Sequence, residues 1–240
     1  MPIIEIQNLS KTFDLPKRKV EVLRDIDFSV KEGEFVLVFG PSGCGKTTLL
    51  NLILGLETPT SGKIKINNKD LSKLTSAEKA RYRLKSFSTV YQNSIWLKSL
   101  SVIENIALPL YLNGIGETDA KAKARSALKE IDMDKFAASR PNELSSGEQQ
   151  RVGLARAMVT DAPIIVADEP TGNSDSHTGH NIIKTLEHLH KQGKTIILVT
   201  HNLSYLAHAD TKIAMKDGQI IGKFHENALP HHLKEMLEEE

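Results

Sequence analysis

The chain has 240 residues, of which 40% are hydrophobic and 25% charged, a globular composition long enough to bury the core of an α/β domain. Its 31 Lys and Arg residues nearly balance 30 Asp and Glu residues, so the sequence lacks the basic field that holds a protein on nucleic acid. A single cysteine, Cys44, excludes an internal disulfide, and no Cys/His cluster has the spacing of a zinc site.

The N-terminal part of the chain predicts a β-rich entry into a core strand. Residues 3–34 alternate apolar and polar types, which indicates short strands with a basic loop at 17–19. The apolar run 35–39 predicts a buried strand, and glycines then interrupt the pattern before a predicted helix over 46–55. The order is therefore strand, glycine loop, helix.

The middle of the chain is predicted to be mainly helical, and the later part alternates helices with strands. Helices are expected over 76–85, 101–111, 117–131, 148–159 and 178–191, with strands over 87–91, 164–168 and 195–200. Such alternation favours a parallel sheet that binds ligands at the carboxyl ends of its strands. Residues 229–240 predict a short acidic helix or tail.

The glycine loop fits the phosphate-binding pattern G-x-x-x-x-G-K-[ST]. The expected nucleotide-binding residues are Gly40, Pro41, Ser42, Gly43, Cys44, Gly45, Lys46, Thr47 and Thr48. Backbone N–H groups of such a loop turn inward around phosphates, and the next helix presents its positive N-terminal end to the same charge. Lys46 adds a cation, and Thr47 offers a hydroxyl to Mg²⁺.

Two adjacent acids, Asp168 and Glu169, end the apolar strand 164–168. This position puts both carboxylates at the carboxyl end of a strand, where we expect them beside the phosphate loop. We assign Asp168 to Mg²⁺ and Glu169 to the base that polarises a water for in-line attack on the γ-phosphate.

The stretch Leu144-Ser-Ser-Gly-Glu-Gln-Gln-Arg151 resembles the signature motif of ABC (ATP-binding cassette) ATPases, usually written L-S-G-G-Q. Here Ser146 replaces the usual second glycine, and Glu148 replaces the common glutamine. The resemblance implies a head-to-tail homodimer that closes over two ATP molecules. In it Ser145, Gly147 and Glu148 would contact the nucleotide held by the other subunit.

Further landmarks of the family occur in order and imply further site residues. Phe13 matches the aromatic residue that stacks on adenine, and Val20 is expected to pack against the ribose. Gln92 matches the glutamine that touches Mg²⁺ and the attacking water.

The interface loop and the switch histidine also match. Asp175 matches the residue of a loop that crosses the dimer interface, although Ser174 stands where relatives usually have leucine. His201 matches the histidine that contacts the γ-phosphate and relays closure between subunits.

The resemblance implies the ABC ATPase fold of the P-loop NTPase class. This α/β fold has a parallel-sheet core, an antiparallel β subdomain and a helical subdomain, expected here at about 93–160 within a single domain 1–240. The stretches 167–173 and 105–110 resemble a group that includes lipoprotein-release, macrolide-efflux and cell-division ATPases. In that group the ATPase drives a separate membrane subunit. We therefore expect a Mg²⁺-dependent ATPase that works on a transmembrane permease-type partner.

Location and the alternative functions follow from the same features. The longest apolar runs fall far short of the roughly 20 residues of a membrane span, and residues 1–10 lack a secretory-signal layout. We expect a cytoplasmic protein held on the inner face of the cell membrane by its partner. A soluble ABC ATPase acting on nucleic acid or ribosomes is an alternative, as is a nucleotide-binding module without turnover. Trp96 is either an apolar anchor for a partner helix or part of the local core.

Overall fold

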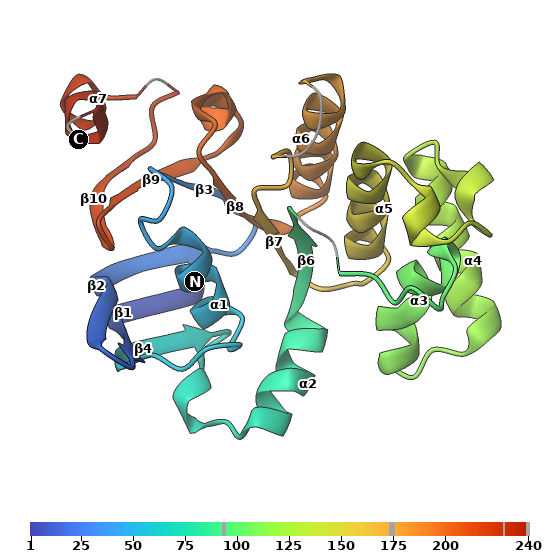
Figure 1. The fold of residues 1–240 in the computed structure, drawn as a ribbon, viewed down its shortest axis with the longest axis horizontal. Helices are drawn as coiled ribbons and strands as arrows, with labels where there is room; N and C mark the ends of the chain where they lie inside the picture. Colours follow the sequence, from blue (N-terminus) through green and yellow to red (C-terminus); the bar gives the residue numbers. More distant parts are fainter. Residues whose placement is uncertain (93–94, 173–175, 228, 239–240) are drawn as a thin grey trace. The chain divides into compact units, whose positions relative to one another are not determined.

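The computed structural model describes residues 1–92, 95–172, 176–227 and 229–238. The chain divides into two compact units, which are described separately below (Figure 1). Unit 1 comprises residues 1–83 and 189–240, and unit 2 comprises residues 84–188.

Unit 1 begins with an antiparallel sheet of strand order β2-β1-β4-β5. Its strands are β1 (Pro2–Leu15), β2 (Arg18–Lys31), β4 (Ser61–Ile66) and β5 (Lys69–Asp70). The predicted short strands are wrong in detail, because β1 and β2 form one long hairpin whose turn is residues 16–17. The basic residues Arg18 and Lys19 belong to β2 and not to the loop.

The second sheet segment of unit 1 has the order β10-β9-β3-β8. It contains β3 (Phe35–Phe39), β8 (Thr195–Thr200), β9 (Thr211–Lys216) and β10 (Gln219–Phe224). Strand β3 is parallel to both β8 and β9, and all five of its residues are fully buried. Burial on both faces explains why β3 reads as an unbroken apolar run. The predicted strands 35–39 and 195–200 are confirmed.

Helices complete unit 1. Helix α1 (Lys46–Ile53) follows β3, and α7 (His231–Glu238) lies near the C-terminus, with short 3₁₀ turns at η1 (Leu71–Lys73) and η4 (Leu203–His208). Helix α2 (Ser76–Ser86) begins in unit 1, and α6 (Ser176–Lys191) ends in it. At the end of α6, His190 Nε2 lies 2.8 Å from Gly33 O and 3.2 Å from Asp210 Oδ2, which ties the helix end to unit 1.

Unit 2 combines two parallel strands with a helical cluster. Strands β6 (Phe87–Tyr91) and β7 (Ile164–Asp168) pair in parallel, as predicted. The helical elements are α3 (Val102–Leu112), α4 (Glu117–Glu130), η2 (Asp134–Phe136), η3 (Pro141–Glu143) and α5 (Ser146–Met158). Buried alanines 120, 124 and 127 let α4 pack closely in a core with Ile106 and Val152.

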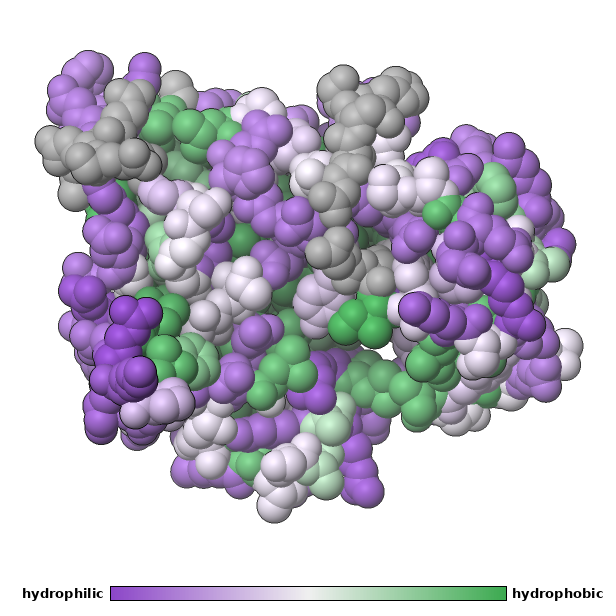
Figure 2. All heavy atoms as spheres, viewed as in Figure 1, coloured by the Kyte–Doolittle hydropathy of each residue, from purple (hydrophilic) through white to green (hydrophobic). Residues whose placement is uncertain are grey.

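Among the described residues, no helix is both long enough and apolar enough to cross a bilayer. On the face drawn in Figure 2, hydrophobic residues are interspersed with hydrophilic ones. The large apolar side chains most exposed in the described ranges include Ile95 (78%) and Leu112 (65%). Scattered apolar residues of this kind are usual at a protein surface.

Candidate active site

The predicted phosphate loop joins β3 to α1, and its glycines are required by close packing. A Cβ atom added to Gly40 would lie 2.0 Å from the backbone oxygen of Met215. Gly45 has a φ of +101°, and a Cβ there would lie 2.7 Å from Leu23 Cδ2. Both positions therefore exclude a side chain, and the loop is wedged between strands of unit 1.

The loop curls around the ammonium group of Lys46. Lys46 is 7% exposed, and its Nζ donates hydrogen bonds of 2.8 Å to the carbonyl oxygens of Gly40 and Pro41. Cys44 Sγ lies 3.9 Å from the same nitrogen. Burial raises the pKa of the Cys44 thiol, although the neighbouring Lys46 charge lowers it. At neutral pH the thiol is therefore protonated and has no evident chemical role.

The loop also offers backbone donors. In the described parts of the chain, the N–H groups of Gly43 and Gly45 donate to no other residue. Gly45 is the N-cap of α1 without a side-chain cap, and the first turn of α1 contains no acidic residue. The positive helix end is thus not neutralised locally, and the loop matches a bound anion such as phosphate.

His201 follows β8 at the same edge of the sheet as the phosphate loop. Strands β3 and β8 are parallel with Phe39 opposite Thr200, so Gly40 and His201 both come directly after paired residues. The His201 side chain is exposed. The structure thus brings the loop and the predicted switch histidine to neighbouring strand ends within unit 1.

Gln92, Asp168 and Glu169 form a corresponding group in unit 2. Tyr91 pairs with Asp168 across the parallel strands β6 and β7, so Gln92 and Glu169 both follow this pair. Glu169 adopts a left-handed backbone with φ of 45°, which costs on the order of 1 to 3 kcal/mol for a residue other than glycine. Such strain is typical of functional positions, where it directs a side chain.

Gln92 packs against the turn that follows Glu169. The N–H of Gly172 donates to Glu169 O at 3.0 Å and closes this turn. A Cβ atom added to Gly172 would lie 2.6 Å from Gln92 Nε2. The absence of a side chain at Gly172 therefore lets the amide of Gln92 approach the turn.

The signature segment forms the N-terminus of α5. The helix begins at Ser146, two residues before its predicted start, and Ser145 is its N-cap. Glu148 Oε2 accepts hydrogen bonds from Ser145 N (2.9 Å) and Ser145 Oγ (2.8 Å), and Glu148 N donates to Ser145 Oγ (3.4 Å). This reciprocal capping box lowers the pKa of Glu148, so its carboxylate is charged at neutral pH.

Phe13 and Val20 lie directly opposite each other in the β1-β2 hairpin, and both are half-buried. Lys11 Nζ lies 4.5 Å from the centroid of the Phe13 ring. It also donates to Glu57 Oε2 (3.1 Å) and Thr58 O (2.8 Å). One face of the Phe13 ring thus carries a fixed cation, and Val20 flanks the ring across the hairpin.

Trp96 belongs to the local core of unit 2. It packs against the helical cluster, and its Nε1 donates to Gln149 Oε1 at 3.0 Å. The Arg156 guanidinium lies 4.4 Å from the Trp96 ring centroid and donates to Ile95 O at 2.8 Å. Desolvation lowers the pKa of Arg156. Of the two expectations for Trp96, these contacts favour local packing over a free anchor.

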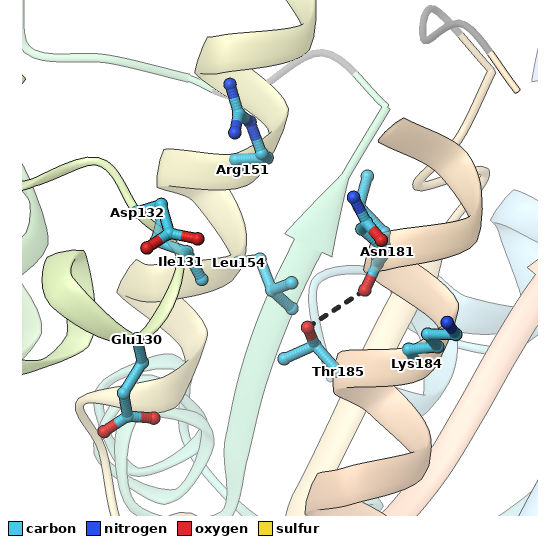
Figure 3. A pocket seen from close by; sticks show the side chains of 9 residues that line it. Glu130, Ile131, Asp132, Arg151, Leu154, Asn181, Lys184 and Thr185 are labelled. Atoms are coloured by element: carbon cyan, nitrogen blue, oxygen red, sulfur yellow. Dashed lines mark hydrogen bonds between the residues drawn. The ribbon is translucent and has the colours of Figure 1, made fainter. Parts of the chain in front are cut away.

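A pocket of about 280 Å³ lies in unit 2, and none of the predicted site residues lines it (Figure 3). Its lining combines residues at and just after the end of α4, on α5 and on α6: Glu130, Ile131, Asp132, Arg151, Leu154, Asn181, Ile182, Lys184 and Thr185. Figure 3 shows the acidic residues on one side and Lys184 on the other, with Thr185 bonded to Asn181 O at 3.0 Å. The sequence reasoning did not find this pocket.

Asp175 and its neighbour Ser174 lie outside the described residues. Within the described ranges, no group of three or more His, Cys, Asp or Glu side chains has the arrangement of a metal site.

Comparisons with known proteins agree with the predicted family. The family model for ABC transporters matches residues 23–172. The macrolide export ATP-binding/permease protein MacB of Mannheimia succiniciproducens is 42% identical over 92% of this chain and 34% of its own length. An uncharacterised ABC transporter ATP-binding protein of Thermotoga maritima is 39% identical over 92% of this chain and 94% of its own. This chain thus spans about a third of the MacB protein.

A solved structure resembles the fold closely. The dimeric ATP-binding cassette MJ0796, in a post-hydrolysis state bound to ADP and Pi, has a TM-score of 0.88 and 34% identity. The match covers 92% of this chain and 98% of that one, which confirms the expected fold class. Since the family model spans more than half of the sequence and the relatives cover 92% of it, the protein belongs to the ABC transporter family.

Proposed function

We propose that this chain binds and hydrolyses MgATP as a head-to-tail homodimer and thereby drives a permease-type membrane subunit. The observation that carries the proposal is the phosphate loop, where Lys46 lies against two loop carbonyl groups and where, within the described part of the chain, the N–H groups of Gly43 and Gly45 donate to no other residue. A loop with this donor set binds the β- and γ-phosphates of a nucleotide. In the proposal, residues 40–48 hold the triphosphate while Phe13 and Val20 hold the adenosine.

The residues proposed for the metal fit Mg²⁺. Thr47, Gln92 and Asp168 would supply a hydroxyl, an amide oxygen and a carboxylate, and Mg²⁺ prefers oxygen ligands of these kinds. When bound, Mg²⁺ neutralises charge on the phosphates during transfer.

Glu169 is proposed as the general base. Its position after β7 and its strained backbone support a role in aligning an attacking water, whose proton its carboxylate would accept. Gln92 would hold the same water, and His201 would donate a hydrogen bond toward the γ-phosphate.

The second half of each site would come from the other subunit. Ser145 and Gly147 at the start of α5, with Asp175, would complete the nucleotide site across the interface, and Glu148 would lie beside the bound phosphate. The dimeric cassette MJ0796 supports this arrangement. The helical subdomain, proposed at about 93–160, would couple closure to the membrane subunit. The name of the MacB relative, an ATP-binding/permease protein, supports such a partner and a location at the membrane.

Glu169→Gln tests this function. The variant should retain ATP binding and lose the base, so turnover should fall by roughly 10² to 10⁴-fold. An ATP-bound dimer should then accumulate and elute earlier in size-exclusion chromatography with MgATP. Lys46→Ala should instead weaken nucleotide binding itself. Glu117→Gln, an equivalent change on the exposed face of α4, is the matched control and should leave turnover unchanged. A Glu169→Gln protein that binds ATP but stays monomeric, even with its membrane subunit, contradicts the mechanism.

A further inference from the structure

The hydroxyl group proposed to receive the partner's phosphate is already engaged within the chain. Ser145 Oγ donates its single proton to Glu148 Oε2 at 2.8 Å, and Ser145 N donates to the same oxygen at 2.9 Å. A hydroxyl has one proton and therefore donates one hydrogen bond at a time. A phosphate oxygen that accepts from Ser145 Oγ must displace the Glu148 carboxylate.

The carboxylate that is displaced remains at the same helix end. Glu148 lies in the first turn of α5, three residues after the N-cap. The positive end of a helix dipole attracts an anion, and Glu148 supplies that anion from within the chain. A second anion at the same end repels the first one, because two like charges at a few ångströms interact unfavourably even in water.

We infer that Glu148 is an electrostatic brake on ATP-driven dimer closure, because it competes with the partner subunit's γ-phosphate for the Ser145 hydroxyl and the start of α5. This inference rests on the proposed function. The exchange involves no covalent change: the Ser145 hydroxyl turns from Glu148 Oε2 to a phosphate oxygen, and both anions then share one helix end. Glu148 therefore lowers the stability of the ATP-bound dimer through its charge.

The substitution that isolates the charge is Glu148→Gln. Glutamine serves the capping box as glutamate does, since its amide oxygen accepts from Ser145, so the start of α5 is preserved. The experiment uses the full chain with Glu169→Gln, which holds ATP without turnover. The dimer dissociation constant is measured by sedimentation equilibrium in MgATP with and without Glu148→Gln. Because a symmetric dimer contains two such sites, a roughly threefold gain at each site gives about a tenfold tighter dimer.

The chain contains a matched control. Ser101 and Glu104 form the same capping box at the start of α3, with bonds of 2.8 Å from Ser101 N, 2.7 Å from Ser101 Oγ and 3.4 Å from Glu104 N. Glu104→Gln in the Glu169→Gln background removes the same charge from the same geometry. It should leave the dimer constant unchanged, whereas Glu148→Gln should tighten it.

Salt provides a second readout that a purely structural role would not change. The difference between the dimer constants with and without Glu148→Gln should shrink as KCl rises, because ions screen exposed charges. If the Glu148→Gln dimer is no tighter than its parent and the variant unfolds at the normal denaturant concentration, the inference about Glu148 is wrong. The proposed function is unaffected by that result. If Glu169→Gln alone forms no dimer in MgATP, the proposed function fails and the brake fails with it. A tightening of equal size in Glu104→Gln also overturns the inference.

Discussion

Asn105 is a buried amide that holds the segment leading into α3. Its removal tests how much this side chain contributes to the free energy of unfolding. The residue is 1% exposed. Its Nδ2 lies within hydrogen-bond distance of three carbonyl oxygens that share its two protons, those of Leu97 (3.1 Å), Leu100 (3.2 Å) and Ser101 (3.0 Å), and its Oδ1 accepts from Leu97 N (2.9 Å). One side chain thus bridges backbone groups of residues 97–101, the segment that leads into α3.

The loss in free energy of unfolding caused by Asn105→Ala depends on which of the amide's hydrogen-bond partners have no other bond. Leu97 O keeps a bond from Leu100 N (3.0 Å), and Ser101 O keeps one from the residue 105 backbone (2.9 Å). Leu97 N and Leu100 O are left without the amide. Each unsatisfied, partly buried polar group costs about 1 to 3 kcal/mol, so the free energy of unfolding should fall by about 3 kcal/mol. For a chain of this size that corresponds to a loss of roughly 6 to 12 °C in melting temperature.

Urea denaturation and thermal melting of the purified chain measure this loss. Asn113→Ala is the matched control, because the exposed Asn113 makes one side-chain bond, from Nδ2 to Pro109 O at 3.0 Å. The control should lose no more than about 0.5 kcal/mol. Asn105→Asp should be destabilised as well, since a carboxylate cannot donate to three carbonyl groups. If Asn105→Ala costs under 1 kcal/mol, or no more than the control, the amide does not hold the segment as described.

Two further predictions concern Trp96 and Cys44. Trp96→Ala should lower the free energy of unfolding by about 2 to 3 kcal/mol, because the hydrogen bond to Gln149 and the stacking with Arg156 are lost with the half-buried indole. If the variant instead has normal stability in denaturant and co-purifies more weakly with a membrane subunit, Trp96 is an anchor for the partner helix. Cys44 is 6% exposed with a raised thiol pKa, so maleimide should label the native chain slowly, faster at higher pH and more slowly with MgATP. Equal labelling rates with and without saturating ATP would contradict the assigned phosphate loop.

The sequence predicts the buried strands well and the hairpins poorly. Strands 35–39, 87–91, 164–168 and 195–200 have the predicted bounds. In all of them except 87–91, burial on both faces produces an unbroken apolar run of at least four residues. The β9-β10 hairpin was missed, although Asp217 and Gly218, with φ of 46° and 77°, carry the Asp-Gly turn signal. Strand β4 was also missed, since its short alternating sequence is interrupted by Gly62.

The sequence predicts where the site residues lie along the strands, but not which contacts they make. The motifs place Gly40, Gln92, Glu169 and His201 directly after strands, and the structure has each of them there. Their roles remain proposals. The left-handed backbone of Glu169 has no sequence signal, because it depends on the turn that Gly172 closes. Asn105 lies in the stretch 105–110 that resembles a group of related ATPases. Its hydrogen bonds could not be predicted, because they depend on the path of residues 97–101.

The two proposed phosphate contacts differ in what an arriving anion must displace. Lys46 now donates to two neutral carbonyl groups, so a phosphate replaces ordinary hydrogen bonds with stronger charge-assisted ones. Ser145 now donates to the charged Glu148, so a phosphate there replaces one charge-assisted bond with another. The exchange at Lys46 favours binding of phosphate to a single chain. The exchange at Ser145 is nearly balanced in free energy even before the repulsion between phosphate and Glu148 is counted. Nucleotide should therefore bind at the phosphate loop first, and closure of the dimer should depend on the remaining interface contacts more than on the start of α5.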